Sequence, residues 1–168
     1  MVQRIVAVAA VLFGLLFAPA LSTASSQDDS VVKFEVMVGV TEPYTGTANP
    51  IRGVGGGGLP WEIDEAHGKL GANGRLKIDV EGLVLARRAP VPANLQGTNP
   101  IPNFKAIVSC MTVTGGAATT TNVETGLVPA SADGDARFNT FVALPNPCIA
   151  PIIFVTSPTG AWFAATGR

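Results

Sequence analysis

His67 is the only histidine of the chain, so any catalytic arrangement that needs an imidazole must use it. A Ser-His-Asp hydrolase also needs a serine nucleophile, and no serine stands in a Gly-x-Ser-x-Gly turn. The strand pattern described below places His67 opposite Asp79 on a solvated face. No catalytic residue is predicted outright. His67 and Asp79 are the candidates for a hydrolase, and an exposed cross-strand pair is the favoured interpretation.

Two short acidic clusters, Glu62-x-Asp64-Glu65 and Asp133-Gly134-Asp135, offer carboxylates. A glycosidase needs two facing acids in a cleft, and spacing along the chain does not show such a pair. One histidine and two cysteines that pair with each other cannot form a standard zinc site. The second cluster lacks the acid spacing of an EF-hand, so a turn is favoured there. The sequence therefore predicts no metal site.

The run Gly53-Val54-Gly55-Gly56-Gly57-Gly58 matches the Gly-x-Gly-x-x-Gly pattern of dinucleotide sites. Such a site needs a strand before the glycines and a helix after them, whereas Pro60 and a predicted strand follow this run. The run indicates a turn or a close backbone approach that lets Trp61 enter the fold. No cofactor is predicted.

Four aromatic residues are candidates for binding: Trp61, Trp162, Phe163 and Tyr44. Exposed rings could stack on sugars or on a protein partner, as at a cell-envelope or polysaccharide surface. In a small sandwich the ordinary place of a tryptophan is the core, beside a disulfide. Both uses stay open at this point.

The N-terminal segment has the pattern of a signal peptide. Arg4 is the only charge before Asp28, and an apolar stretch from Ile5 to Ala18 precedes Pro19. Small residues at Ser22 and Ala24 favour cleavage after Ala24, which predicts a signal peptide over 1–24 and one domain over 25–168. The apolar stretch is short for a membrane anchor, so no span is expected after cleavage. The predicted location is outside the cell, by the general secretory route.

Export would determine the oxidation state of the two cysteines. Cys110 and Cys148 would both reach an oxidising compartment, where pairing is the default, so a disulfide is predicted between them.

Charged residues are 14% and hydrophobic residues 47% of the chain, which argues against a disordered chain and against a nucleic-acid binder.

The mature chain has strand patterns throughout and no sustained helical period. Strands are predicted over 31–40, on both sides of Ala72-Asn73-Gly74 within 61–86, and over 103–113, 118–125, 135–144, 151–156 and 161–166. A three-residue turn with a left-handed Gly74 sets Leu70 opposite Leu76. About eight strands favour an antiparallel β-sandwich, with a closed β-barrel as the alternative. Two long connections, 41–60 and 87–102, are predicted as loops.

Two motifs resemble those of small secreted bacterial proteins of unknown function. They are Gly56-Gly57-Gly58-Leu59-Pro60-Trp61-Glu62-Ile63 and the segment from Cys148 to Ala164, Cys-x-Ala-Pro-Ile-x-Phe-Val-Thr-Ser-Pro-x-Gly-x-Trp-Phe-Ala. The resemblance covers about residue 30 to the C-terminus and implies export and a one-domain build. It implies no named functional family and no site residues.

Three functions follow as hypotheses. The first is a secreted, non-catalytic β-domain with a binding or structural role at the cell envelope or outside the cell. The second is a small secreted hydrolase that uses His67 and nearby acids. The third is a ligand-binding β-barrel lined by alternating valines and phenylalanines.

Overall fold

The computed structural model describes residues 29–166, and every regular element in that range is a strand. The predicted signal peptide, residues 1–24, lies outside the described residues. In chain order the strands are β1 (Ser30–Phe34), β2 (Met37–Gly39), β3 (Trp61–Glu62), β4 (Glu65–Gly71), β5 (Arg75–Glu81), β6 (Val84–Leu85), β7 (Asn103–Thr114), β8 (Ala117–Glu124), β9 (Val128–Pro129), β10 (Ala136–Phe141), β11 (Ile149–Thr156) and β12 (Trp162–Thr166).

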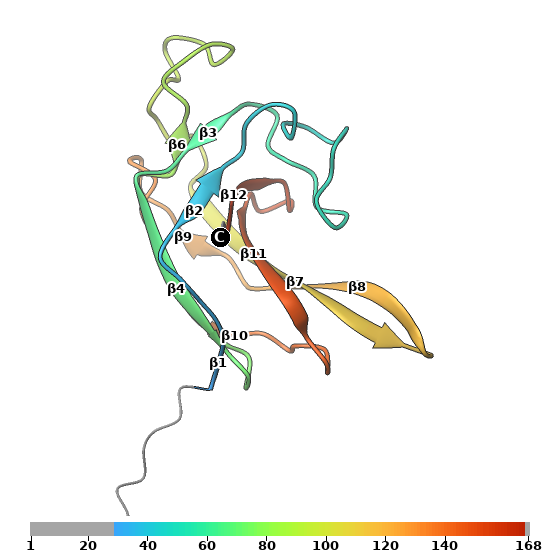
Figure 1. Cartoon of the computed structure of the whole chain (residues 1–168). Coiled ribbons are helices and arrows are strands. Elements are labelled where there is room, and N and C mark those ends of the chain that lie inside the picture. The colour runs from blue at the N-terminus through green and yellow to red at the C-terminus, as the bar shows by residue number, and fades with distance from the viewer. Residues whose placement is uncertain (1–28, 167–168) are drawn as a thin grey trace, which may run out of the picture.

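The strands form a sandwich of two main antiparallel sheets (Figure 1). A four-stranded sheet has the order β1-β4-β5-β10, and a six-stranded sheet has the order β2-β12-β11-β7-β8 with β9 also paired to β7. A small third sheet joins β3 to β6. The all-β sandwich is as predicted, and the separate sheets with terminal strands exclude the closed barrel. Eight strands have five or more residues, which matches the expected number.

The hairpin of β4 and β5 follows the predicted register. Leu70 lies opposite Leu76, and Gly74 has a φ of +82°. Glycine takes this left-handed conformation without steric cost, which closes the three-residue turn. The inward side of the hairpin is buried and apolar, as the alternation required.

The prediction of one strand over 31–40 is wrong. β1 pairs with β4 in one sheet, whereas β2 pairs with β12 in the other, and the chain crosses between them at Glu35 and Val36. The crossing reverses the inward alternation, so Val36 and Val38 are exposed and Met37 is buried. Where a chain passes from one sheet to another, the alternation of buried and exposed side chains shifts by one residue. The sequence pattern alone did not show this shift.

A second crossing occurs at Gly82. Gly82 has a φ of +66° and separates β5 from the short strand β6. Beyond it Trp61 pairs with Leu85, within the separate β3–β6 sheet. The chain thus leaves the four-stranded sheet at a glycine.

The predicted strands in the C-terminal half are confirmed with small shifts in their ends, and only β9 was not expected. The loops 41–60 and 87–102 contain no strand. Residues Ser157 to Gly160 close the β11–β12 hairpin, with Gly160 N donating to Ser157 O at 3.0 Å. The predicted Cys110–Cys148 disulfide is present.

Side chains from both sheets meet in one core. The four-stranded sheet contributes Leu70, Ile78 and Phe138, and the six-stranded sheet contributes Phe104, Val108 and Ile153, all fully buried. Close packing of this kind fixes the distance between the two sheets. It also leaves the sheet margins as the places where a cleft can form.

Within residues 29–166 there is no helix of the length and apolar character that a membrane crossing requires.

Candidate functional site

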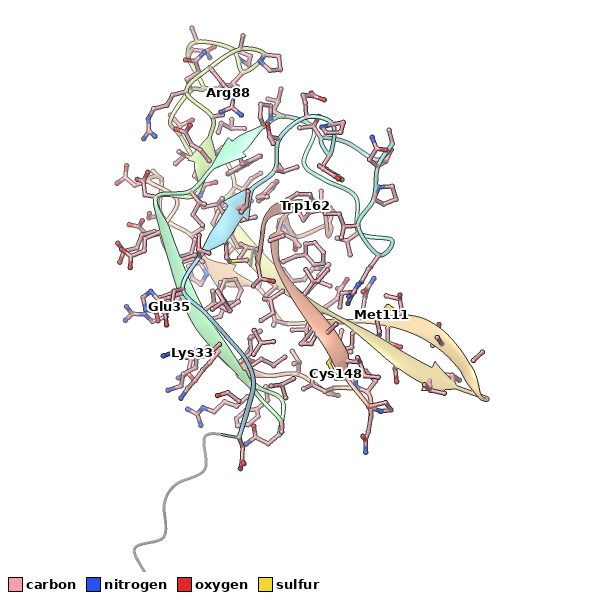
Figure 2. All side chains as sticks on the ribbon, in the orientation of Figure 1. Lys33, Glu35, Arg88, Met111, Cys148 and Trp162 are labelled. Carbon is pink, nitrogen blue, oxygen red and sulfur yellow. A yellow bond between two sulfur atoms is a disulfide. The ribbon has the colours of Figure 1, made fainter. Side chains whose placement is uncertain are left out.

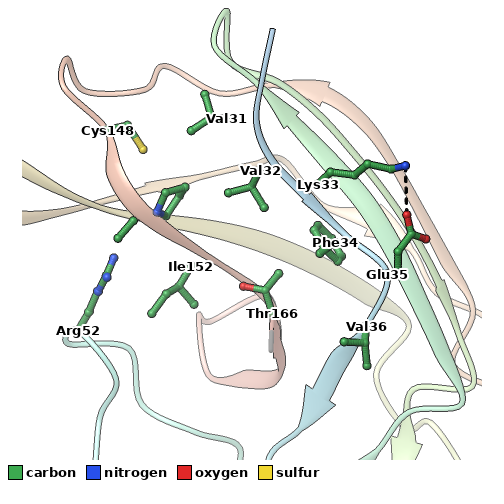
Figure 3. Close-up of a pocket in the computed structure, with 12 residues that line it drawn as sticks. Val31, Val32, Lys33, Phe34, Glu35, Val36, Arg52, Cys148, Ile152 and Thr166 are labelled. Carbon is green, nitrogen blue, oxygen red and sulfur yellow. Dashed lines mark ion pairs between the residues drawn. The ribbon is translucent and has the colours of Figure 1, made fainter. Parts of the chain in front are cut away.

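A depression lies between strand β1 and the beginning of strand β11 (Figure 3). Its volume is about 740 Å³. One wall is β1 and its continuation, and the other is the chain from Cys148 to the first half of β11. We call it the groove; it is lined by Val31, Val32, Lys33, Phe34, Glu35, Val36, Arg52, Cys148, Ala150, Pro151, Ile152 and Thr166.

The β1 wall exposes a backbone edge as well as side chains. Four consecutive residues of β1, Val31 to Phe34, line the groove, and so do the next two residues, Glu35 and Val36. Successive side chains of a strand point to opposite faces, so a depression lined by every one of them runs along the edge of the strand. Among the strands of residues 29–166, β1 is the terminal strand of its sheet and is paired with β4. This edge therefore has room for another strand.

The β11 wall is open over its first half. β12 pairs with β11 only from Phe154 to Thr156, so Ile149 to Ile152 have β7 on one side and no strand of residues 29–166 on the other. A register shift lies in this half, and Ala150 has a φ of +45°. Pro151 has no N–H to donate. This wall thus supplies apolar contacts more than hydrogen bonds, and β1 is the better edge.

Two features hold the groove in shape. The disulfide ties Cys148, at the start of the β11 wall, to Cys110 on β7. At the other end, the Thr166 hydroxyl accepts a hydrogen bond from Ile153 N at 3.1 Å, which fastens the last residue of β12 to β11. Both walls are therefore built on paired strands rather than on loops.

The charges at the groove leave a net charge of +1. Lys33 and Glu35 form an exposed ion pair at 3.4 Å, drawn as a dashed line in Figure 3. Arg52 also lines the groove, and its Nη1 donates to Ser109 O at 3.0 Å. That bond uses only part of the guanidinium, which has five N–H donors. A carboxylate entering the groove would meet Arg52.

The structure places His67 on the outward face of the four-stranded sheet, half-exposed, and not in the groove. It lies opposite Asp79, as predicted, with His67 Nε2 at 3.7 Å from Asp79 Oδ2 and Nδ1 at 3.7 Å from Glu65 Oε1. Asp79 is also paired with Arg137. The ring nitrogens thus face two carboxylates, Glu65 and Asp79.

Two of the other candidate acids, Glu62 and Asp135, contact other residues of the fold. Glu62 pairs with Arg87, and Asp135 Oδ1 accepts a hydrogen bond from Gly82 N at 3.0 Å. Between Asp29 and Thr166, no three His, Cys, Asp or Glu side chains gather closely enough to hold a metal ion.

Three of the four candidate binding aromatics belong to the interior, among them Trp162, which is labelled in Figure 2. Trp61 and Phe163 stack at 4.0 Å between ring centroids, and each is 4% exposed. Trp162, also 4% exposed, lies beside Phe154 at 5.9 Å. These rings cannot stack on a ligand in this structure, because apolar side chains already cover them. Only Tyr44 is exposed.

The glycine run provides the predicted close backbone approach. Trp162 N donates to Gly55 O at 2.9 Å, and Gly57 N donates to Trp162 O at 2.8 Å, so the run lies against β12. A Cβ on Gly57 would lie 3.0 Å from the Phe163 ring, and one on Gly56 would overlap the Tyr44 carbonyl oxygen. Bare backbone is required at both positions.

The sequence did not predict the groove. Its β1 residues were recognised as a strand, but the edge position of that strand depends on β4, 34 to 41 residues away in the pairs that the two strands form. Lys33 and Glu35 were the available signal, since charges are common on exposed edges. Comparison with known proteins finds no family model, no curated protein and no solved structure that matches this chain, in agreement with a resemblance that carries no named functional family.

Proposed function

We propose that this chain is a non-catalytic binding domain that acts at the cell envelope or outside the cell, and that its groove takes an extended segment of a partner protein. The observation that carries the proposal is the continuous run of groove-lining residues along the free edge of β1. An extended peptide can add to such an edge as a further strand, with main-chain hydrogen bonds that supply affinity. The four groove-lining residues of β1, Val31 to Phe34, correspond to about 13 Å of extended chain.

The lining predicts the chemistry of the segment. Val31, Val36 and Ile152 favour apolar side chains, and only every second side chain of an added strand would face them. Arg52 favours one acidic side chain, because it gives the groove its net positive charge. The expected partner segment therefore alternates apolar and small polar residues and carries one Asp or Glu.

The proposed location rests on the N-terminal pattern of residues 1–24 and on the disulfide. Disulfides persist in oxidising compartments, and a domain with a cystine beside its groove is suited to one. A partner would then be another exported or surface protein.

The test is selection of peptides on the purified domain, residues 25–168, from a displayed library of random eight-residue segments. We expect enrichment of alternating apolar sequences with one acid. Affinity of a selected peptide should fall at least tenfold on Val36→Lys. The matched control is Val38→Lys, because Val36 is 49% and Val38 56% exposed but only Val36 lines the groove.

A second measurement separates strand addition from general apolar adhesion. N-methylation of the selected peptide at successive positions removes one N–H at a time, and only alternate N–H groups of an added strand face β1. We expect binding to be lost at alternate positions. Absence of enrichment, equal binding to Val36→Lys and Val38→Lys, or indifference to N-methylation would each overturn the proposal.

A further inference from the structure

A second exposed edge lies at the far side of the six-stranded sheet. The end of β7 and most of β8 project from the body as a two-stranded ribbon, shown in yellow and light orange in Figure 1. We call residues 109–123 the arm. β7 and β8 pair without interruption up to Thr114 and Ala117, and Gly115 and Gly116 close the turn with positive φ.

In the part of the chain that the structure describes, one edge of the arm has no neighbouring strand along its whole length. There β8 is the terminal strand of the sheet and is paired with β7. On the other side, β11 reaches β7 no further than Met111. From Thr112 to Thr119 the arm is therefore two-stranded within residues 29–166, a structure that gains little stability from its own pairing in water.

The arm carries no charge. No Asp, Glu, Lys, Arg or His occurs between Lys105 and Glu124. Both terminal strands of the four-stranded sheet are different: β1 has Lys33 at its edge and Glu35 directly after it, and β10 has an exposed Arg137. Charged side chains on an edge strand discourage pairing with another chain, and β8 lacks this protection.

Apolar side chains on the arm are exposed on its outward face. Val113 is 50% exposed and lies opposite Ala118, and the half-exposed Met111 lies between Thr120 and Ile149. The body of the protein does not cover them. The arm thus offers both unpaired backbone groups and uncovered apolar surface.

We propose that the arm pairs with the arm of a second copy of this chain, β8 against β8, in antiparallel orientation about a two-fold axis. An antiparallel pair of identical strands is self-complementary, since every contact occurs twice. With the axis at Thr120, Thr119 faces Thr121 of the second copy and no charge faces a like charge. Cross-strand Thr pairs stabilise such a contact. The two six-stranded sheets become one continuous sheet.

The size of the contact predicts its strength. Pairing of about seven residues on each strand buries less surface than a standard protein interface, so a reversible dimer with a Kd of about 10–100 µM is expected. At lower concentration the protein would be monomeric.

The test is sedimentation velocity of residues 25–168 from about 1 µM to 1 mM, a range that brackets the expected Kd. We expect concentration-dependent dimers for the unchanged domain. Thr120→Lys and Thr120→Glu should each weaken dimerisation at least tenfold, because like charges then meet at the axis. A mixture of the two variants should dimerise, since opposite charges meet. Val38→Lys, which adds the same charge outside the arm, should dimerise normally.

Near-ultraviolet circular dichroism checks that the variants fold, and β8 amides should become protected from hydrogen exchange as concentration rises. A monomer at all concentrations, or dimers unaffected by either Thr120 variant, would overturn the proposal. So would dimers lost only on Val113→Lys, which would indicate packing of outward faces instead. Peptide selection in the groove is independent of the Thr120 variants, so failure of one proposal leaves the other distinguishable.

Discussion

The two ends of strand β7 differ in how far the side chains on its outward face are buried. At its beginning, Ile107 is buried beneath segment 41–60, together with Phe154 and Trp162. At its end, Val113 is half-exposed and nothing covers it. The side chains are equally apolar at the two ends, so hydrophobicity along the strand does not decide which end is covered.

The covered end of β7 is buried by segment 41–60, which forms hydrogen bonds with both β7 and β8. Arg52 Nη1 donates to Ser109 O, and Asn122 Nδ2 donates to Arg52 O at 3.1 Å, so the segment is fastened to both β7 and β8. The glycine run then pairs with Trp162. These contacts end at Ser109, where the arm begins. The comparison shows that a loop buries apolar side chains of a strand where it can also form hydrogen bonds with the backbone. The end that no loop of residues 29–166 buries belongs to the arm, which we propose for contact with another molecule.

The largest expected loss of stability follows from removing a buried side chain beneath segment 41–60. Phe154→Ala removes a fully buried ring and should lower the free energy of unfolding by about 3–5 kcal/mol. Val113→Ala, at the bare end of the same face, should change it by less than about 0.5 kcal/mol. Urea denaturation of both variants measures the difference. Similar losses would contradict the division into a covered and a bare end.

The disulfide is attached to β7 at Cys110, next to Ser109, where the contacts of segment 41–60 end. Cys110 and Cys148 are 38 residues apart in sequence, and closing such a loop stabilises a domain by up to about 4 kcal/mol on the chain-entropy model. The double variant Cys110→Ala/Cys148→Ala should lose that amount in urea denaturation. It should also loosen the β11 wall, so hydrogen exchange near Ile152 should rise. If exchange rose on the arm alone, the disulfide would serve the bare end rather than the groove.

The cover itself can be tested at one glycine. A Cβ at Gly56 would overlap the Tyr44 carbonyl oxygen and lie 3.0 Å from Val40 Cγ2, so Gly56→Ala should cost about 2–3 kcal/mol. Gly58→Ala is the matched control, because no atom lies within 4 Å of its added Cβ. Thermal unfolding followed by tryptophan fluorescence compares them. Equal midpoints would show that the run is not held against Trp162.

The smallest effect is expected on the four-stranded sheet, whose outward face is charged and needs no cover. His67→Ala removes a half-exposed ring from between two carboxylates, and the free energy of unfolding should change by less than about 0.5 kcal/mol. Peptide binding in the groove should be unchanged. A hydrolytic activity that disappears in His67→Ala, with folding intact, would replace the binding proposal by the hydrolase hypothesis.

Several parts of this fold were predictable because they depend on neighbours in the sequence. The β4–β5 register follows from the left-handed Gly74 and from alternation around Leu70 and Leu76, and the β11–β12 turn follows from Ser157 to Gly160. The exposed pair of His67 and Asp79 follows from the same register. The cysteine pairing needed only two cysteines and an oxidising destination.

The sequence by itself therefore determined the all-β class, the main strands and the hairpin faces, because turn chemistry and two-residue alternation are local. Only the tertiary structure decided which sheet each strand joins, and hence that 31–40 divides between two sheets, that β1 and β8 are edges, and that both tryptophans are buried. Strand partners are distant in the chain, so an edge and the groove beside it exist only once the sheets have assembled.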